Sequence, residues 1–365
     1  MKPVLHVITT IARGGAEIQL LTLVREQRLS NREVNVLYLK DFPELDQELS
    51  AIGVKVLHNI AKMSFVKQVF WTRQFLKDCD VIIHSHLPRA QILVALAKRT
   101  QPIVISRHDA ERFFANGNKL LSICLARFVA LRSESAVAIS GAVANAMKNS
   151  CEFPKNFPIE VVHYGYNPSF LKNTLVSPIM IDGTELKLSK KLVFGTIARL
   201  VEQKDHPTLL RAFAMYCDNF SDTYLIIVGD GSLKDELIQL AAELGINEKV
   251  CWLGHRTDIP EVLNNMDVFI LASKTEGFGL VLLEAMSRGL PIIGSKSTAI
   301  PEVLGDDGGM LFETGNAKQL FEHMKQLRNP QVRKEMADKA LKRLEFFAPQ
   351  NLLVKLDKIY EKAGG

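Results

Sequence analysis

The stretch VFILASKTEGFGLVLLEAMSRGLPIIG, residues 268–294, decides the fold class. It opens with an apolar run, Val268–Leu271, passes through a turn that contains two glycines, and continues into an amphipathic segment, Leu280–Gly289. A second apolar run, Pro291–Gly294, follows directly. Short buried strands that alternate with helices are typical of βαβ units. The stretch therefore predicts an α/β protein with a parallel sheet that is covered on both faces.

Apolar runs of the same kind recur along the chain and predict two successive series of strands, with helices between them. The first series comprises Val4–Ile8, Glu33–Leu39, Val54–Leu57, Val81–His84, Ile103–Ser106, Ala136–Ile139 and Glu160–Val162. The second comprises Leu192–Ala198, Thr223–Val228, Lys249–Leu253, Val268–Leu271, Pro291–Gly294 and Gly309–Phe312. We therefore expect two doubly wound, Rossmann-like domains.

The length of 365 residues also favours two domains, because one hydrophobic core rarely serves so long a chain. Between Asn167 and Lys191 the strand and helix periodicity fades into a polar segment. We predict a first domain over residues 1–172, a linker over 173–190, a second domain over 191–348 and a final helix over 349–365. Ligands of open α/β sheets bind at the carboxyl ends of the strands, so we expect the site in a cleft between the domains.

The composition excludes several classes of protein. Apolar residues make up 47% of the chain and charged residues 23%, which is ordinary for a globular protein and argues against a disordered or fibrous one. The five cysteines are widely scattered and form no C-x-x-C pair, so we expect neither disulfides nor a structural zinc site. No segment has the length and apolarity of a membrane span. We expect a cytoplasmic protein.

The formal net charge is +5, and the basic excess lies in the first half of the chain. Such a distribution suits an anionic partner, for example a phospholipid surface or a lipid-linked diphosphate. Nucleic acid is a weaker alternative, because the aromatic residues are not interleaved with basic ones as in single-strand-binding proteins. We expect no nucleic-acid partner.

The turn between the strand and helix of residues 268–294 carries the strongest functional signal. Its residues are Glu276, Gly277, Phe278, Gly279 and Leu280, and Glu284 follows inside the helix. The glycines allow close approach of the backbone to a ligand, and a helix N-terminus offers free N–H groups to a diphosphate. One carboxylate is then placed to hold sugar hydroxyls and the other a ribose; alternatively, both glutamates are solvated helix residues.

Two cations, Arg199 and Lys204, follow the predicted strand Leu192–Ala198 and precede the helix that is expected from Pro207. Positive side chains at the carboxyl end of a strand are placed to neutralise a diphosphate leaving group without a metal ion. The simpler alternative is that both are surface charges.

Two weaker signals lie in the first domain. Gly14 and Gly15 follow the first strand, where they would leave room for donor phosphates or serve only as a connector; G-x-G-x-x-G is absent there. His84-Ser85-His86 and His108-Asp109 each follow a predicted strand, and we expect a histidine there to face the crevice. We interpret His108 as a contact to the transferring sugar and His86 as structural. The spacing fits no usual metal-ligand motif.

These segments, in this order, resemble the retaining GT-B glycosyltransferases of family 4, and the resemblance extends over essentially the whole chain. Glu276 and Glu284 match that family's E-x7-E motif. The resemblance implies that Arg199 and Lys204 grip the donor diphosphate, that Glu276 binds donor-sugar hydroxyls and that Glu284 binds the ribose. It further implies that His108 contacts the transferring sugar.

The resemblance extends to other donor contacts and to the overall architecture. It places Gly14 and Gly15 beneath the donor phosphates. It also implies that backbone groups near Arg256 hold the nucleotide base of the donor. It also implies that the last helix crosses back to the first domain. Two departures from the family pattern stand out: Ala198 replaces a glycine before the arginine, and residues 163–167 read HYGYN where Asn-Gly-Val is frequent.

The expected activity is retaining transfer of a hexose-type sugar from a nucleotide diphosphate sugar to a hydroxyl acceptor, without a metal or cofactor. UDP is favoured over GDP as the nucleotide. By the habit of the family, the acceptor is a glycan or lipid-linked intermediate of bacterial envelope or capsular polysaccharide synthesis. A sugar-nucleotide epimerase of the same fold and a non-catalytic nucleotide-sugar-binding partner remain alternatives; a nicotinamide oxidoreductase is the least supported.

Two basic and apolar segments, His58–Lys77 and Lys119–Arg132, bear on localisation. Basic amphipathic helices lie on anionic membranes, so peripheral contact with the inner face of the cytoplasmic membrane is one expectation. The alternative is that the aromatic residues of these segments pack against their own sheet.

Overall fold

The computed structural model describes residues 1–114, 117–167, 180–181, 184–185 and 191–364. The chain divides into two compact units. Unit 1 consists of Met1–Asn167 with Phe347–Gly365, and unit 2 of Pro168–Phe346. Most of the predicted linker, residues 173–190, lies outside the described residues. Its described part holds a short antiparallel pair that we did not predict, β8 (Met180–Ile181) with β9 (Thr184–Glu185).

Unit 1 is built on a seven-stranded sheet in the order β3-β2-β1-β4-β5-β6-β7, with parallel pairing throughout. Its strands are β1 (Val4–Ile8), β2 (Val34–Tyr38), β3 (Lys55–Leu57), β4 (Ile82–His86), β5 (Ile103–Arg107), β6 (Ser135–Ala138) and β7 (Ile159–Val161). The central strands are buried on both faces, which explains why they appear in the sequence as continuous apolar runs.

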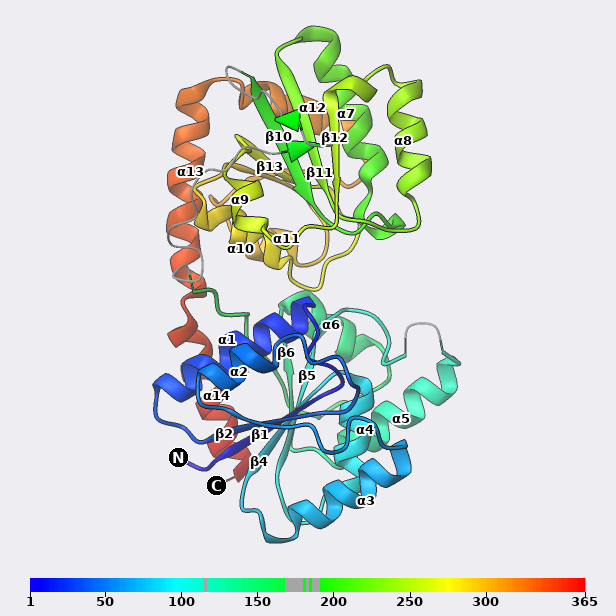
Figure 1. The fold of residues 1–365 in the computed structure, drawn as a ribbon, viewed down its shortest axis with the longest axis vertical. Helices are drawn as coiled ribbons and strands as arrows, with labels where there is room; N and C mark the ends of the chain where they lie inside the picture. The colour runs from blue at the N-terminus through cyan, green and yellow to red at the C-terminus, as the bar shows by residue number, and fades with distance from the viewer. Residues whose placement is uncertain (115–116, 168–179, 182–183, 186–190, 365) are drawn as a thin grey trace. The chain divides into compact units, whose positions relative to one another are not determined.

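Helices cover both faces of this sheet (Figure 1). One face carries α1 (Gly15–Leu29), α2 (Asp46–Ala51) and the C-terminal helix α14 (Pro349–Gly364), and the other carries α3 (Phe65–Phe75), α4 (Pro88–Ala97) and α5 (Lys119–Leu131). The remaining helix, α6 (Gly141–Asn149), connects β6 to β7. Leu356 and Ile359 of α14 join the hydrophobic core of unit 1 together with Val4 and Val104 of the sheet.

Unit 2 has a six-stranded parallel sheet in the order β12-β11-β10-β13-β14-β15. Its strands are β10 (Leu192–Ile197), β11 (Thr223–Val228), β12 (Val250–Gly254), β13 (Val268–Leu271), β14 (Ile292–Ser295) and β15 (Met310–Phe312). Its helices are α7 (His206–Asn219), α8 (Lys234–Glu243), α9 (Ile259–Leu263), α10 (Leu280–Ser287), α11 (Ile300–Leu304), α12 (Ala317–Gln326) and α13 (Pro330–Leu344).

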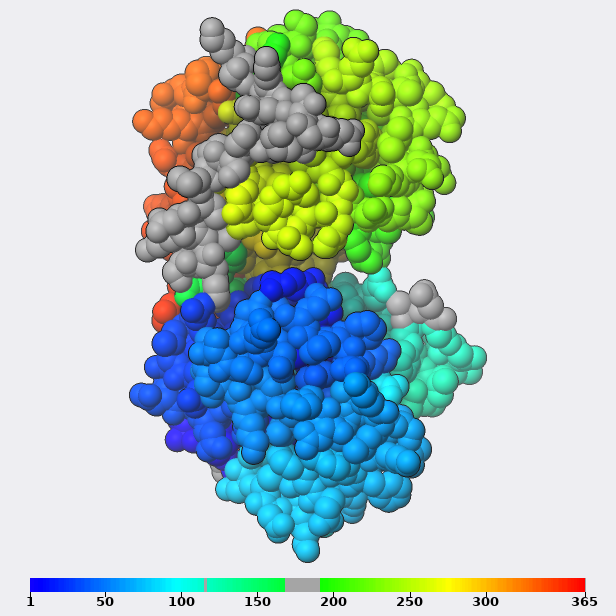
Figure 2. Space-filling view, in the orientation of Figure 1, coloured from blue at the N-terminus to red at the C-terminus, as the bar shows by residue number. Residues whose placement is uncertain are grey.

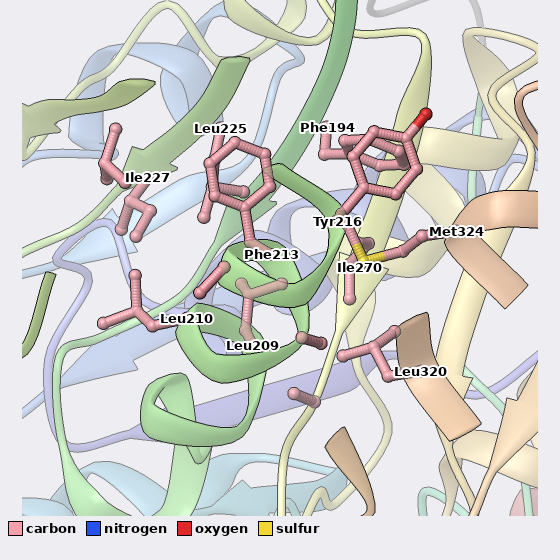
Figure 3. Close-up of a cluster of buried hydrophobic side chains, with 14 of the residues drawn as sticks. Phe194, Leu209, Leu210, Phe213, Tyr216, Leu225, Ile227, Ile270, Leu320 and Met324 are labelled. Carbon is pink, nitrogen blue, oxygen red and sulfur yellow. The ribbon is translucent and has the colours of Figure 1, made fainter. Parts of the chain in front are cut away.

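The core of unit 2 lies between this sheet and the pair α7 and α12. Phe213 and Tyr216 of α7 pack with Phe194 of β10, and Leu320 and Met324 of α12 complete the cluster (Figure 3). All five side chains are fully buried. Burying a large apolar side chain contributes roughly 1.5–3 kcal/mol. This packing fixes the strands whose ends carry the charged residues described below.

The two units confirm the predicted GT-B fold of two Rossmann-like domains, and all thirteen predicted strands are present with ends shifted by no more than two residues. The largest shift is at β4, which continues to His86, whereas we expected it to end at His84. The polar residues His84, Ser85 and His86 masked the continuation, although all three are buried in the strand.

Candidate functional site

Each sheet reverses its strand order at one point, and several of the predicted site residues follow the strands at these points. In unit 2 the chain builds outward from β10 to β11 and β12 on one side, and then from β13 to β15 on the other. The reversal therefore lies between β10 and β13. In open α/β sheets such a switch point forms the ligand crevice at the carboxyl ends of the strands. Arg199 and Lys204 follow β10, and Glu276 follows β13.

Lys204 and Glu276 meet across this switch point. Lys204 ends a short 3₁₀ turn, η3 (Glu202–Lys204), and its Nζ forms an ion pair with Oε1 of Glu276. The two side chains are only 16% and 11% exposed. Asp205, directly after the turn, adopts a left-handed backbone with φ of 48°, which separates η3 from α7. Two residues that are 72 positions apart thus share one half-buried site.

Further hydrogen bonds fix Glu276. Ser273 Oγ donates to the same carboxylate oxygen, Oε1, at 2.9 Å. The Thr298 hydroxyl accepts from the backbone N–H of Glu276 at 2.7 Å and donates to its carbonyl at 2.9 Å. The position of this carboxylate is therefore set by three elements of unit 2, so it is arranged before any substrate arrives.

The helix that follows Glu276 begins as predicted. Gly279 is its N-cap residue and has φ of 85°, a conformation that favours glycine, and α10 starts at Leu280. Glu284 lies in the fifth position of α10. Its side chain keeps some exposed surface, but protein encloses most of the carboxyl, and this burial raises its pKa to about 7. A carboxyl that is half protonated near neutrality is suited to exchange hydrogen bonds with hydroxyl groups.

The remaining predicted residues of unit 2 differ in their surroundings. Arg199 is exposed at the end of β10, and no partner for its side chain is found among the described residues. Arg256 lies after β12 and forms an ion pair with Asp258, with Nε donating to Oδ1 at 2.7 Å. Phe278 is buried and anchors the turn. The structure therefore brings Lys204 and Glu276 together, whereas it gives Arg256 a partner of its own.

In unit 1 the strand order reverses between β1 and β4, and the predicted glycines follow β1. Gly14 is the N-cap residue of α1 and Gly15 its first residue. A Cβ atom at Gly14 would lie 2.5 Å from Oε2 of Glu17, so a larger residue there would displace this carboxylate. Thr10 Oγ1 donates to Oε1 of Glu17 at 2.7 Å. The Glu17 carboxylate in the first turn of α1 is thus one reason for a glycine at position 14, independent of any ligand.

The histidines of unit 1 differ from our expectation. We placed His84-Ser85-His86 at the end of a strand, expected a histidine there to face the crevice, and interpreted His86 as structural. All three residues belong to β4, and His84 and His86 are 1% and 2% exposed. His84 is the register partner of His6 in β1, which is fully buried as well. The expectation that a histidine faces the crevice at this strand end was wrong, whereas the structural interpretation of His86 agrees with its burial. Strand alternation places both His84 and His86 on the sheet face under α1 and α14.

A hydrogen-bonded chain runs from Tyr164 through three imidazoles to Gln27 of α1. His108 bonds through Nδ1 to the Tyr164 hydroxyl and through Nε2 to His86 Nδ1 at 3.2 Å. His86 Nε2 meets His6 Nδ1 at 3.0 Å, and His6 Nε2 meets Gln27 Oε1 of α1 at 2.8 Å.

A second branch starts at Tyr360 of α14. Its hydroxyl lies 2.6 Å from His84 Nδ1, and His84 Nε2 lies 2.7 Å from Ser106 Oγ. The amide nitrogen of Gln27 reaches the same Tyr360 hydroxyl at 3.4 Å, which joins the branch to the chain. Both branches therefore meet at Gln27 of α1, on the sheet face that α1 and α14 cover.

Burial keeps these imidazoles neutral. It lowers the pKa of His6 and of His108 to about 4 each, and that of His84 and His86 well below the usual range. His108 keeps some exposed surface, but protein encloses most of its ring. A small cavity of about 30 Å³ adjoins the cluster and is lined by Gln19 and Tyr164 as well as by three of the histidines.

The three buried histidines His6, His84 and His86 are also close enough together to be candidate metal ligands. One ligand atom each from His6, His84 and His86 lies within 4.8 Å of those of the other two, and neutral imidazoles are good ligands for zinc or copper. However, both ring nitrogens of all three residues already have protein partners in the structure. A metal ion would have to replace several of these hydrogen bonds.

Sequence reasoning missed His6, Gln27, Tyr360 and Ser106. His6 gave one signal, a polar residue in the middle of the apolar run Val4–Ile8. A buried polar residue needs hydrogen-bond partners, so its presence indicates a network. The partners come from strands and helices up to 333 residues apart, and their pairing cannot be read from spacing.

Comparison with known proteins identifies both halves of the chain. Residues 13–170 match the family described as Glycosyltransferase Family 4, and residues 181–343 match Glycosyl transferases group 1. The chain belongs to glycosyltransferase family 4. The predicted family is thereby confirmed, and so is the prediction of an enzyme that transfers a sugar.

Three curated relatives of this glycosyltransferase come from bacteria. The putative glycosyltransferase EpsF of Bacillus subtilis is 27% identical over 313 residues, covering 81% of this chain and 79% of the relative. The Escherichia coli UDP-Gal:alpha-D-GlcNAc-diphosphoundecaprenol alpha-1,3-galactosyltransferase is 28% identical, covering 77% and 78% of the two chains. The capsular polysaccharide biosynthesis glycosyltransferase CapM of Staphylococcus aureus is 24% identical over 91% of this chain and 90% of its own.

A solved structure supports the fold of the glycosyltransferase. HepE of Anabaena, in complex with UDP-glucose, superposes with a TM-score of 0.81 at 21% identity, covering 99% of this chain and 100% of HepE. The described part of the glycosyltransferase contains no helix with the length and apolarity required to span a membrane.

Proposed function

We propose that this glycosyltransferase moves a hexose-type sugar from a UDP-sugar to a hydroxyl of a lipid-linked glycan intermediate, with retention of anomeric configuration and without a metal ion. The observation that carries the proposal is the pair Lys204 and Glu276 at the switch point of unit 2, with the exposed Arg199 following the same strand, β10, as Lys204. The E. coli relative uses UDP-Gal and a diphosphoundecaprenol-linked acceptor by name, and HepE binds UDP-glucose. Both favour UDP over GDP.

In the proposed reaction Arg199 and Lys204 neutralise the diphosphate as the bond from its oxygen to the anomeric carbon breaks. The acceptor hydroxyl attacks from the same face and passes its proton to the departing phosphate oxygen. Glu276 holds hydroxyls of the donor sugar, and Glu284 binds the ribose. The partly buried Lys204 and the exposed Arg199 together supply the charge stabilisation that a divalent ion provides in other enzymes.

Metal independence gives a direct test. With a UDP-hexose and a polyprenyl-diphosphate sugar acceptor, we expect turnover in EDTA to remain within about twofold of turnover in Mg²⁺, because the leaving group is neutralised by side chains. The anomeric configuration of the product is then read by NMR, and retention is expected. Loss of activity in EDTA that is restored by Mg²⁺ would refute the cation assignment.

Incubation with the donor alone separates the alternatives within the family. Transfer requires the acceptor, so the nucleotide sugar should remain unchanged apart from slow hydrolysis. Conversion of the donor to an isomer would instead indicate an epimerase. Donor binding without turnover under any acceptor would indicate a non-catalytic nucleotide-sugar-binding partner.

We further propose that unit 1 contacts an anionic membrane through α3 and α5. On α3, Val66 and Phe70 are 62% and 69% exposed and flank the exposed Lys67. On α5, Leu120 and Leu131 are 73% and 77% exposed. The blue and light-blue residues of the first part of the chain form a broad face of unit 1 (Figure 2). Apolar residues next to basic ones are the chemistry of interfacial helices.

Flotation with liposomes tests this contact. We expect the protein to float with phosphatidylglycerol vesicles at low salt, and Val66→Ser with Phe70→Ser to weaken that binding at least tenfold, since two exposed apolar side chains are lost. Leu341→Ser, at a 43% exposed position of α13 in unit 2, is the matched control and should leave flotation unchanged. Equal binding of wild type to neutral vesicles would contradict the role of the basic residues.

A further inference from the structure

The hydrogen bonds of the buried chain from Tyr164 to Gln27 all donate in one direction, which the amide group of Gln27 determines. Gln27 presents Oε1 to His6 and its amide nitrogen to the Tyr360 hydroxyl. A carbonyl oxygen only accepts, so His6 Nε2 carries the proton and Nδ1 of the same neutral ring is an acceptor. His86 Nε2 must therefore donate to His6 Nδ1, at 3.0 Å.

The same rule applies at each further step. With Nε2 protonated, the neutral ring of His86 accepts at Nδ1, so Nε2 of His108 donates to it. His108 Nδ1 is then an acceptor and receives the hydroxyl proton of Tyr164. Every donor in the chain meets an acceptor, and the direction from Tyr164 to Gln27 is the same in each bond.

The second branch agrees with this direction independently. Tyr360 accepts from the Gln27 amide, so its own hydroxyl proton is available to His84 Nδ1 at 2.6 Å. His84 Nε2 then donates to Ser106 Oγ at 2.7 Å. All four histidines thus have the proton on Nε2. Reversing the chain would require a flip of Gln27 and the reversal of the Tyr360 bonds as well.

We propose that Tyr164, His108, His86, His6 and Gln27 form one polarised hydrogen-bond chain, and that His6 is a positioning residue that sets the tautomer of His108 from two links away. His6 lies in β1 and has no bond to His108; it acts through His86. Both ring nitrogens of His108 are occupied within the protein. The ring is therefore held neutral and in one orientation, and it does not act as the base that removes the acceptor proton.

The functional part of this inference rests on the proposed contact between His108 and the transferring sugar. The loop after β5 that carries His108 begins where the sheet ends, so a rotated or re-tautomerised ring would alter the surface offered to the sugar. A misplaced contact in an otherwise intact site is expected to lower kcat more than it raises KM, because orientation matters most in the transition state.

Two substitutions at one position separate polarity from packing. His6→Gln keeps a carbonyl that accepts from His86 and an amide that donates to Gln27, so the chain keeps its direction. His6→Phe keeps a ring but leaves the Nε2–H of His86 without an acceptor, and a buried unpaired donor is costly. His86 then carries its proton on Nδ1 and donates to Nε2 of His108. Because Nε2 of His108 is now an acceptor, the neutral His108 ring carries its own proton on Nδ1.

The readout is the ¹⁵N–¹H spectrum of histidine-labelled full-length protein at pH 7, because the two ring nitrogens report directly which one carries the proton. We expect Nε2–H signals for all four buried residues in the wild type, the same pattern for His108 in His6→Gln, and an Nδ1–H signal for His108 in His6→Phe. Turnover should be retained in His6→Gln and fall about tenfold in His6→Phe, mostly in kcat.

Ser106→Ala is the matched control, since it removes a buried acceptor from the His84 branch and leaves the chain to His108 intact. It should not change the His108 signal. An unchanged His108 tautomer in His6→Phe, a doubly protonated ring in the wild type, or a bound transition metal on His6, His84 and His86 would overturn the proposal. A changed tautomer with full turnover would uphold the chain and refute the contact of His108 with the sugar.

Discussion

Lys204→Ala lowers turnover at least a hundredfold while unit 2 stays folded. Lys204 is the buried member of the cation pair at the switch point, only 16% exposed, so its charge is less screened than that of a surface lysine. Removing one preorganised group that stabilises developing charge typically costs about 10²–10³ in rate. The loop after β10 would also bind the donor diphosphate less tightly, so KM for the donor should rise.

The variant has a structural side effect that the experiment has to separate. Glu276 would lose its ion-pair partner, although Ser273 Oγ still donates to its carboxylate at 2.9 Å. We expect a modest loss of stability, visible in the thermal unfolding of unit 2. The double variant Lys204→Ala with Glu276→Gln relieves the unpaired charge and should recover stability but not activity, since both groups are needed for transfer.

Lys296→Ala provides the matched control. Lys296 also follows a strand of the same sheet, β14, and pairs with Glu313 at 2.9 Å, but it is 56% exposed. Exposed ion pairs contribute about 0–1 kcal/mol, and this one lies outside the proposed site, so turnover should stay near that of the wild type. Near-normal turnover in Lys204→Ala would remove the central step of the proposed mechanism.

The second large effect is a loss of stability of unit 1 in mild acid. Burial holds the pKa of His6 at about 4 in the folded protein, below its ordinary value of 6.5. As the pH falls through 6.5, the His6 imidazole becomes protonated in the unfolded chain but stays neutral in the folded chain. The unfolded state therefore binds more protons, and lower pH favours it. The stabilisation is fully present above pH 6.5 and is lost progressively down to about pH 4.

The magnitude follows from the size of the shift. Lowering of the pKa from 6.5 to about 4 corresponds to about 3 kcal/mol for His6 alone. His84, His86 and His108 shift in the same direction for the same main reason. Because marginal stability is typically about 5–15 kcal/mol, unit 1 should unfold at a pH well above that of ordinary acid denaturation.

The measurement uses the two tryptophans, Trp71 in α3 of unit 1 and Trp252 in β12 of unit 2. In a Trp252→Phe background, fluorescence during urea unfolding reports unit 1 alone. The free energy of unfolding should fall steeply between pH 6.5 and pH 4, and His6→Gln should flatten this fall by about 3 kcal/mol. His58→Asn, at an exposed position in the same unit, should leave the slope unchanged, and equal slopes in all three proteins would contradict the assignment.

Which features could be predicted from the sequence depends on how local they are. The strands of both sheets were predicted because parallel strands buried on both faces appear as uninterrupted apolar runs, as in Val268–Leu271. The turn before α10 was predicted because Gly277 and Gly279 lie between an apolar run and an amphipathic segment, and Gly279 has a positive φ in the structure. In each case the deciding residues are neighbours in sequence.

The parts that could not be predicted depend on pairing across the fold. The contact between Lys204 and Glu276 joins residues 72 positions apart, and only the strand order reveals that β10 and β13 are adjacent. The end of β4 was misplaced because His84 and His86 are polar, and their burial is compensated by partners on other strands and on two helices. No periodicity in the sequence records such partners.

The position of α14 affects how the protein is made. Leu356, Ile359 and Tyr360 complete the core of unit 1, yet they are translated after the whole of unit 2. On the ribosome, the first unit to emerge therefore lacks one of its covering helices until α14 (Pro349–Gly364) leaves the exit tunnel, whereas unit 2 can fold as soon as its own segment has emerged. Chains that stop short of residue 349 would leave an exposed apolar sheet face and invite degradation or aggregation.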